Sequence, residues 1–417
     1  MSDPTFGVSI TRIDNEPRPA VWSDMSVVGL IGTAPAADAA AFPLDTPVFM
    51  YSDDAVKRTA LGASGTIPEA LSLINAQLGE FQVAAKVVIV RVAEGDTVAE
   101  TIANIVGDGI STGLEAFVHA GPTLGVIPRL LCAPGFTSQR DGTDANAICV
   151  ALPAVCSKRL AHAVVDGPAT TEQAALDWRE TLSSSRLIPV DPAVRVLNGT
   201  EVAVVPLSPA VIGIGVRRDH EKQGRPFHSW ANQPVQGIVG PSRPINFSLT
   251  DGATEGQRML SHNLGVLLRG EMGVETAIAS GGFVYVGTDN AGEDDLWRFY
   301  NVTRGRDYIH LMFLRTLRFY LGRFNITGQT VQAVLNTIGF ALRDLKADGD
   351  ILGYEVKGAS PSTSRPRRRR CCATSASSRP AIARRSTRCS TICSPRSAPL
   401  PVNQENSHEY NLCHGGV

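Results

Sequence analysis

The last sixty residues of this 417-residue chain lack lysine and almost all aromatic residues. Residues 358–417 contain no lysine, one aromatic residue (Tyr410) and two acidic residues, but ten arginines and five of the eight cysteines. Their net charge of about +8 leaves about −9 on the first 357 residues, so the near-neutral total conceals two unlike segments. Three interpretations compete: a basic nucleic-acid-binding tail, a cysteine-based metal or disulfide module, and a stretch translated in the wrong frame.

The residue types that are missing from the tail decide between these interpretations. Nucleic-acid-binding tails usually mix lysine with arginine and carry aromatic side chains that stack on bases. A metal site needs thiolates at a fixed spacing, such as two C-x-x-C pairs, and the tail cysteines do not have it: Cys371, Cys372, Cys389, Cys393 and Cys413. The wrong frame is therefore the favoured interpretation.

The genetic code allows that interpretation to be examined on paper. Read one nucleotide earlier with GC-rich codons, residues 380–397 can spell ARYRPALDALLDDLLAEV, in which leucine recurs at the three- and four-residue spacing of an amphipathic helix. The same shift can turn residues 367–373 into AEAPVLR. We therefore predict that residues 358–417 are out of frame and disordered, which the gene sequence or the intact mass of the natural protein would test.

The first 357 residues lack the signals of secreted and membrane proteins. The chain opens without a basic and then apolar leader, and no stretch approaches the roughly twenty apolar residues of a membrane span. The three cysteines of this part, Cys132, Cys149 and Cys156, each lie in apolar sequence, which predicts buried free thiols. We expect a soluble, unsecreted protein without membrane insertion.

Motifs of catalysis and nucleotide binding are also missing. Asp166 follows a predicted strand close to His162, yet no G-x-S-x-G elbow occurs, and the sequence around Ser138 lacks the small neighbours that a nucleophilic serine needs. Residues 213–215 lack the third glycine of a dinucleotide fingerprint, and there is no Walker sequence. His162 is predicted to be a hydrogen-bonded core histidine, and residues 219–221 (DHE) a solvated turn rather than a metal site.

The pattern of apolar residues predicts an α/β fold. Short β-rich runs alternate with helical stretches, which implies a doubly wound, mostly parallel sheet covered by helices. The expected strands are 27–32, 86–91, 129–132, 162–165 and 187–190, and the helices between them are 68–78, 98–106, 144–155 and 171–182. Residues 198–282 read as long connections around a helix at 255–268, followed by a strand at 281–287 and helices at 307–321 and 330–346.

Two further segments suggest contacts with partners. Phe6, Val8 and Ile10 alternate with small or polar residues before Pro17 and Pro19, which predicts a lone strand that must add to the edge of a sheet in this or another subunit. The helix at 307–321 has an apolar face (Ile309, Phe313, Leu317, Tyr320, Leu321) and a basic face (Arg315, Arg318, Arg323). That basic face is either solvated or a docking surface for an acidic partner.

The order of these features resembles the tail sheath proteins of contractile phage tails and related injection machines. The resemblance covers residues from about 6 to 357 and rests on these segments: 7–8 (GV), 26–34 (SVVGLIGTA), 42–44 (FPL), 47–48 (PV), 88–92 (VIVRV), 112–114 (TGL), 128–131 (PRLL), 134–135 (PG), 229–232 (SxxN), 237–240 (GIVG), 281–287 (GGFVYVG) and 297–304 (WRFYNVxR).

The resemblance implies a structural, non-enzymatic subunit with a subtilisin-like but non-catalytic α/β domain. Such subunits polymerise helically around a tail tube and contract to drive it through the target envelope, with no cofactor. The implied organisation is an N-terminal exchange arm (1–22), an α/β sheath domain with insertions (23–275), a smaller α+β C-terminal domain facing the tube (276–357) and the anomalous tail (358–417).

It also implies partners and sites. The partners would be further copies of the chain, the tail tube protein, and baseplate and tail terminator proteins, in the virion and in the host cytoplasm during assembly. The exchange arm would use Phe6, Gly7, Val8, Ser9 and Ile10, and Arg315, Arg318 and Arg323 would contact the tube. Two alternatives remain: a nucleic-acid-binding protein that uses the arginine-rich tail, and a hydrolase on a subtilisin-like fold.

Overall fold

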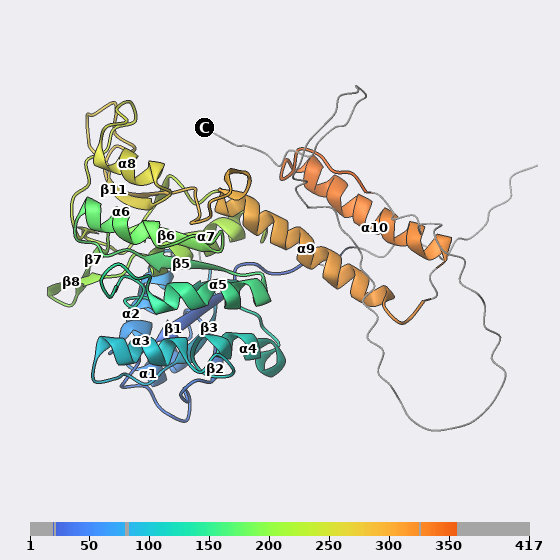
Figure 1. Ribbon diagram of the computed structural model, residues 1–417, viewed down its shortest axis with the longest axis horizontal. Helices are drawn as coiled ribbons and strands as arrows, with labels where there is room; N and C mark the ends of the chain where they lie inside the picture. The colour runs from blue at the N-terminus through green and yellow to red at the C-terminus, as the bar shows by residue number, and fades with distance from the viewer. Residues whose placement is uncertain (1–19, 21, 80–82, 325–326, 357–417) are drawn as a thin grey trace, which may run out of the picture. The chain divides into compact units, whose positions relative to one another are not determined.

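The computed structural model describes residues 20, 22–79, 83–324 and 327–356 (Figure 1). The chain divides into two compact units: a larger one, Trp22–Met312, and a second one that includes the described residues from Phe313 onward. The division falls inside a long helix, whereas the sequence predicts a domain boundary between residues 275 and 276. The arm residues Phe6, Gly7, Val8, Ser9 and Ile10 and the tail from 358 lie outside the described residues.

A nine-stranded mixed sheet forms the centre of the larger unit, in the order β2-β3-β1-β4-β5-β6-β11-β12-β9. The strands β3, β1, β4, β5, β6 and β11 run parallel to one another, and β2, β12 and β9 pair antiparallel at the two ends. The strands are β1 Val28–Gly32, β2 Pro47–Tyr51, β3 Lys86–Arg91, β4 Leu130–Cys132, β5 His162–Asp166, β6 Leu187–Asp191, β9 Gln233–Pro234, β11 Gly265–Arg269 and β12 Phe283–Val286. The predicted α/β fold with a mostly parallel sheet is confirmed.

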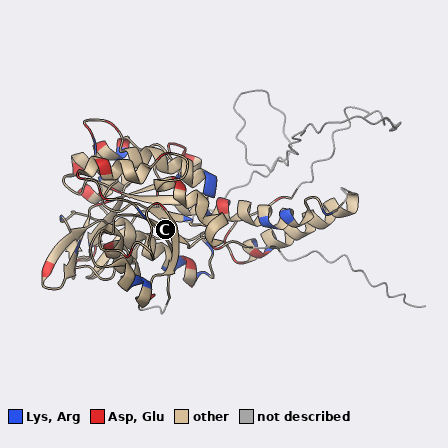
Figure 2. Ribbon diagram, turned by 90° about the horizontal axis from the view of Figure 1, so that it is seen from below, with Lys and Arg blue, Asp and Glu red and all other residues tan. Residues whose placement is uncertain are grey.

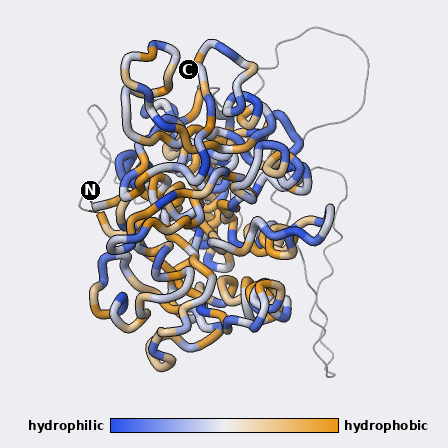
Figure 3. Tube along the Cα trace, turned by 90° about the vertical axis from the view of Figure 1, so that its left-hand side faces the viewer, coloured by the Kyte–Doolittle hydropathy of each residue, from blue (hydrophilic) through white to orange (hydrophobic). Residues whose placement is uncertain are grey.

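Helices cover both faces of this sheet, so alternate residues of one strand enter different cores. In β3, Val87 and Ile89 join the core beneath α2 (Thr66–Ala76) and α7 (Ser208–Glu221). Val88 and Val90 join the opposite core, beneath the helices α3 Val98–Val106, α4 Ala116–Leu124, α5 Ala147–Arg159, α6 Glu172–Glu180 and α8 Glu255–Ser261. Burial on both faces explains the continuous apolar strands, and Figure 3 shows hydrophobic segments concentrated inside this unit.

Several helices, including α1 (Ala55–Leu61) and α10 (Gly328–Ala347), begin at a side chain that caps the first turn. The side chains of Asp54 and Thr327 accept hydrogen bonds from backbone N–H groups at the starts of α1 and α10. Thr97, Asn146 and Thr171 cap α3, α5 and α6 in the same way. These caps satisfy donors that a first turn leaves unpaired. The helix α9 (Tyr300–Tyr320) begins seven residues earlier than the predicted 307.

Residues 198–282 hold more regular structure than predicted. The helix predicted at 255–268 is confirmed in its first half and wrong in its second: α8 begins at Glu255 but ends at Ser261, Asn263 adopts φ +60°, and the chain then forms the buried strand β11. Asparagine tolerates this left-handed conformation, which stops a helix. A three-stranded antiparallel sheet in the order β10-β7-β8 was also not predicted; it comprises β7 Val194–Asn198, β8 Glu201–Val205 and β10 Gly240–Pro241.

The turn predicted at residues 219–221 is also wrong, because these residues form the last turn of α7. The glycines that made this segment look like a loop are packing positions: a Cβ on Gly213 would lie 2.7 Å from Gln77 Cγ, and one on Gly215 would lie 2.7 Å from Trp230 Cζ2. Strand β12 follows the predicted domain boundary but pairs with β11 in the nine-stranded sheet.

None of the helices in the described ranges is both long and apolar enough to cross a membrane. Within the same ranges, no three histidine, cysteine or acidic side chains gather as metal ligands would.

Candidate functional site

The first three turns of α9 are buried in the larger unit. Its inward stripe has the spacing of one helix face, and it carries charge as well as apolar groups: Tyr300, Thr303, Arg304, Asp307, Tyr308, Leu311 and Met312. This stripe differs from the apolar face predicted from the sequence, of which Leu321 is 73% exposed. We call these contacts the α9 anchor.

A buried ion pair is the centre of the α9 anchor. Arg304, fully buried in α9, donates from Nη1 and Nη2 to the two carboxylate oxygens of Asp219 in α7, at 3.1 and 2.5 Å. The guanidinium lies 4.9 Å from the ring centroid of Trp230 and also donates to the Met25 carbonyl oxygen at 3.3 Å. Burial raises the pKa of Asp219, although Arg304 opposes this shift. The bidentate pair therefore ties α9 to α7 where water cannot compete.

Tyr300 connects the start of α9 to two loops. Its hydroxyl donates to the Gly287 carbonyl oxygen at 2.9 Å and accepts the Trp230 N–H at 2.7 Å, and the two rings lie 4.7 Å apart. Burial raises the pKa of Tyr300 to about 12, so the hydroxyl keeps its proton. Asn301 donates to the Phe227 carbonyl oxygen at 2.9 Å. Segments 229–232 and 297–304, which carried the family resemblance, are therefore in contact.

Glycine at position 305 allows this approach. A Cβ there would lie 2.5 Å from Phe227 Cδ1, and real Cβ atoms do not come so near. Any larger residue would push segment 225–231 away from α9.

Further contacts join α9 to the strands. Arg186, just before β6, forms an ion pair with buried Asp307. His162 Nε2 lies 3.1 Å from Thr303 Oγ1, and burial together with nearby arginines lowers the pKa of His162 well below its ordinary value. The predicted hydrogen-bonded core histidine is confirmed. The predicted free, buried thiols are also confirmed, and burial raises the pKa of Cys149 and Cys156 to about 12, which makes them poor nucleophiles.

The carboxylate considered for catalysis has a structural partner. Asp166 at the end of β5 accepts hydrogen bonds from the N–H and Oγ of Ser208 at 2.7 and 2.5 Å. Both side chains are buried, and Ser208 is 0% exposed. Burial raises the pKa of Asp166 to about 6 despite these hydrogen bonds. The pair joins α7 to β5 and does not present a serine to a substrate.

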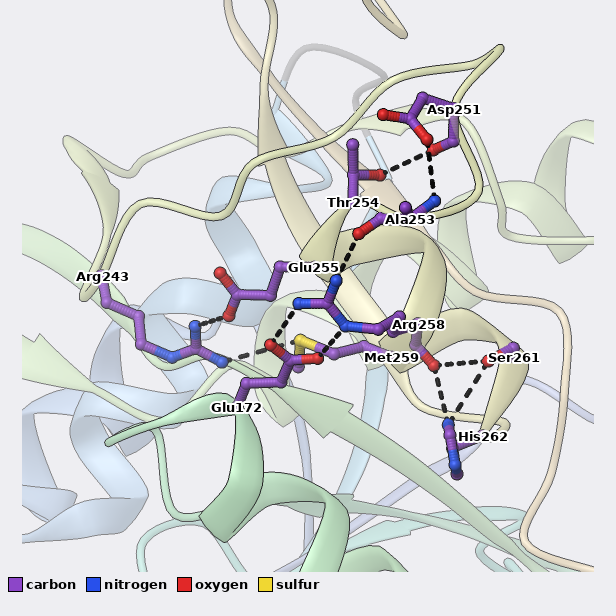
Figure 4. Close-up of polar contacts among 10 residues, drawn as sticks. All are labelled: Glu172, Arg243, Asp251, Ala253, Thr254, Glu255, Arg258, Met259, Ser261 and His262. Atoms are coloured by element: carbon purple, nitrogen blue, oxygen red, sulfur yellow. Dashed lines mark hydrogen bonds and ion pairs between the residues drawn. The ribbon is translucent and has the colours of Figure 1, made fainter.

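A second set of ion pairs fastens the connection between β10 and β11. Arg243 donates to Asp191 in β6 at 3.0 Å and also pairs with Glu255 in α8. Figure 4 shows Arg258 facing Glu172 of α6, with which it forms two hydrogen bonds of 2.6 Å. Burial raises the pKa of Asp191, and Arg243 opposes this shift. These contacts hold a glycine- and proline-rich stretch in one position.

The candidate tube contacts lie beyond the buried part of α9. Arg315, Arg318 and Arg323 are all exposed, as a docking surface requires. Arg323 lies over the Phe319 ring at 5.0 Å, and exposed apolar side chains share this stretch: Leu314, Leu321 and Phe324. Figure 2 shows basic positions along the C-terminal helices, whereas both signs of charge mix over the larger unit. We call residues 314–324 the basic end of α9.

The sequence analysis did not predict that Asp219 and Arg304 form a buried ion pair. A signal was present, because Arg304 and Asp307 stand in the same helical stripe as Tyr300, Tyr308 and Leu311. Charges inside an apolar stripe indicate buried ion pairs. Asp219 had no such signal, since its helix was not recognised.

Known proteins similar to this chain are sheath subunits, although no family model matches it. The putative prophage major tail sheath protein of Pseudomonas aeruginosa (strain UCBPP-PA14) is 28% identical over 360 residues, which cover 84% of this chain and 86% of that protein. The tail sheath protein of Escherichia phage P2 is 26% identical over 363 residues, with the same coverage. Among solved structures, the contracted helical sheath of the anti-feeding prophage has a TM-score of 0.58 at 17% identity, covering 87% of this chain and 88% of that one.

These likenesses extend along most of both chains, and together with the α/β fold they define a structural, non-enzymatic protein of contractile tails. The chain is a contractile tail sheath subunit, and hence a component of the virion.

Proposed function

We propose that this subunit polymerises helically around a tail tube and contracts to drive the tube through the target cell envelope. The observation that carries the proposal is the likeness to sheath subunits along most of the chain. A head-to-tail interface that does not close on itself builds such a helix without a cofactor. The work of contraction would come from repacking into a lattice of lower free energy, with the extended form kinetically trapped.

Electron microscopy of the purified chain tests this function. Two chains are compared: the 417-residue chain, and a version in which the shifted frame is restored after residue 357. We expect hollow tubes or stacked rings from the restored chain and few from the 417-residue chain, because the family's C-terminal arm would be absent from the latter. If neither chain forms tubes or rings, with or without a tube protein, the proposal is wrong. Equal assembly by both chains would contradict only the frame interpretation.

The N-terminal residues Phe6, Gly7, Val8, Ser9 and Ile10 would form the strand exchanged between subunits, because backbone pairing is what a lone strand needs. A Val8→Pro substitution removes one N–H donor from that strand, and Val8→Thr keeps it. We expect the proline variant to remain folded but not to assemble, and the threonine variant to assemble. Normal assembly of the proline variant would contradict the exchange.

The basic end of α9 would contact the tube, within a C-terminal region (276–357) that faces it. Arginines beside exposed aromatic and aliphatic side chains are the composition of interface hot spots. The double variant Arg315→Glu/Arg318→Glu should lose co-sedimentation with tube protein, whereas Lys222→Glu, an exposed charge at the end of α7, should not. Unchanged co-assembly of the double variant would exclude these contacts.

The remaining partners and the finer fold follow from the same family. Baseplate and tail terminator proteins would bind the two ends of the sheath, and assembly would take place in the host cytoplasm. The nine-stranded sheet would be subtilisin-like without a catalytic centre, which the buried Asp166–Ser208 pair supports. Labelling of the folded subunit by a serine-directed probe would contradict this.

A further inference from the structure

The segment between the N-terminal arm and β1 is closely packed. Of its residues, Met25 is fully buried, and Ser23 and Val27 are 5% and 4% exposed. A flexible linker would not bury such groups, since burial stabilises one position of the backbone. The chain therefore enters the larger unit along a fixed path from Trp22 onward.

Aromatic contacts hold the first residue of this path. The rings of Trp22 and Tyr308 stack with centroids 4.8 Å apart and an angle of 12° between their planes. Tyr308 belongs to the inward stripe of α9, and its ring meets that of Phe227 edge-on at 5.8 Å. Offset stacks and edge-to-face pairs of this kind add to the energy of burial. Trp22 is thus fixed to α9, the helix that leads out of the larger unit after Met312.

Polar contacts hold Asp24 and Met25. Asp24 Oδ2 forms an ion pair with Lys86 Nζ of β3 at 2.8 Å. The Met25 carbonyl oxygen accepts a hydrogen bond from Arg304, the same guanidinium that pairs with Asp219. The entry segment, α7 and α9 therefore share one buried cation, so that none of the three can move without disturbing the other two.

A cleft lies beside these contacts. It has a volume of about 320 Å³ and is lined in part by Trp22, Asp24, Lys86, His220 and Tyr308. The cleft borders Trp22 and Asp24, so one side of each residue faces open space. The aromatic stack and the ion pair therefore hold these two residues, whereas burial also holds Met25.

We propose that Trp22, Asp24 and Met25 form a clamp that fixes the chain to α9 at the point where the N-terminal arm joins the larger unit. The role given to this clamp rests on the proposed exchange of the arm, whereas its contacts do not. A neighbour that pulls on the arm then acts directly on α9 and α7, instead of peeling residues 22–27 away from the larger unit.

Limited proteolysis of the unassembled full-length chain tests the clamp. Thermolysin cuts before large apolar residues, so a product that begins at Met25 reports detachment of the entry segment. We expect Trp22→Ala to yield this product about tenfold faster than wild type. Trp22→Phe, which keeps an aromatic ring against Tyr308, should yield it at an intermediate rate. The matched control is Phe340→Ala, which removes a half-exposed aromatic side chain that contacts Arg343 in α10 and should leave the rate unchanged.

The outcomes separate the clamp from other causes. An unchanged rate in Trp22→Ala, or an equal increase in Phe340→Ala, would overturn the proposal. If Trp22→Ala does not fold, Lys86→Gln replaces it, because this change removes the exposed ion pair to Asp24 without altering the sequence around the cut. We then expect a two- to threefold increase, and no increase would overturn the clamp. The measurement needs no assembly, so a chain that forms no tubes would contradict the proposed function and leave this test valid.

Discussion

The two halves of α9 contain similar residues but lie in opposite environments. In the first half, Arg304 and Asp307 are 0% exposed and each pairs with an opposite charge. In the second half, Arg315 and Arg318 are exposed. Removing one member of a buried ion pair is costly because the other charge is left without a partner or solvation, whereas removing an exposed charge has little effect on stability. Arginine therefore anchors the first part of this helix and leaves the second part available to a partner.

Breaking the central ion pair should have the largest effect. We expect Arg304→Met to lower the free energy of unfolding by about 3–5 kcal/mol, because Asp219 is left buried and unpaired. The double variant Arg304→Met/Asp219→Leu should lose less than the sum of its single variants, since it leaves no orphan charge. Urea denaturation measures both, with Arg318→Met as the exposed control. Additive losses, or an equal loss in the control, would contradict the contrast between the two halves.

Asp166 is a buried carboxylate whose hydrogen-bond partners are neutral, in contrast to Asp219 and Asp307, which pair with arginines. Burial raises its pKa to about 6, against 3.8 for the ordinary side chain. The native state therefore holds this proton more tightly than the unfolded state. Its contribution to stability is fully present below about pH 4 and is lost as the pH rises through about 6.

The shift corresponds to about 3 kcal/mol over this window. We expect Asp166→Asn to remove that part of the pH dependence in denaturation curves recorded between pH 4 and 7. Ser208→Ala removes a hydrogen bond to the carboxylate and should extend the loss to higher pH. If the two variants follow the wild-type pH dependence, Asp166 is not the titrating group.

Packing at the anchor should have an intermediate effect. Gly305→Ala places a methyl group against Phe227, and we expect it to lower the free energy of unfolding by about 1–3 kcal/mol. The matched control is Gly339→Ala in α10, where a Cβ meets no atom within 4 Å. That change should stabilise by about 0.5–1 kcal/mol, because alanine favours a helix over glycine. Thermal unfolding of both variants would show the opposite signs, and equal signs would count against close packing at residue 305.

The sequence predicted the elements with strong periodicity and missed those that depend on contacts. Residues 98–106 and the strand at 86–91 were placed at their observed bounds, because capping residues and long β-branched runs act locally. The helix α7 was missed because Gly213 and Gly215 favour loops until Gln77 and Trp230 pack against them. For the same reason the Arg304–Asp219 pair, 85 residues apart, could not be inferred from either segment alone.

The smallest effect on stability is expected from the exposed arginines of the second half of α9, whose interactions should depend strongly on salt concentration. Exposed charges are screened beyond a Debye length of about 8 Å at physiological ionic strength, while dry pairs are screened much less. We expect Arg315→Gln/Arg318→Gln to change the free energy of unfolding by less than about 0.5 kcal/mol, yet to reduce the salt dependence of binding to tube protein. Titrating salt in co-sedimentation assays measures this slope. A slope equal to wild type would mean that the basic end of α9 faces solvent in the assembled tail, and that its exposure serves solubility rather than docking.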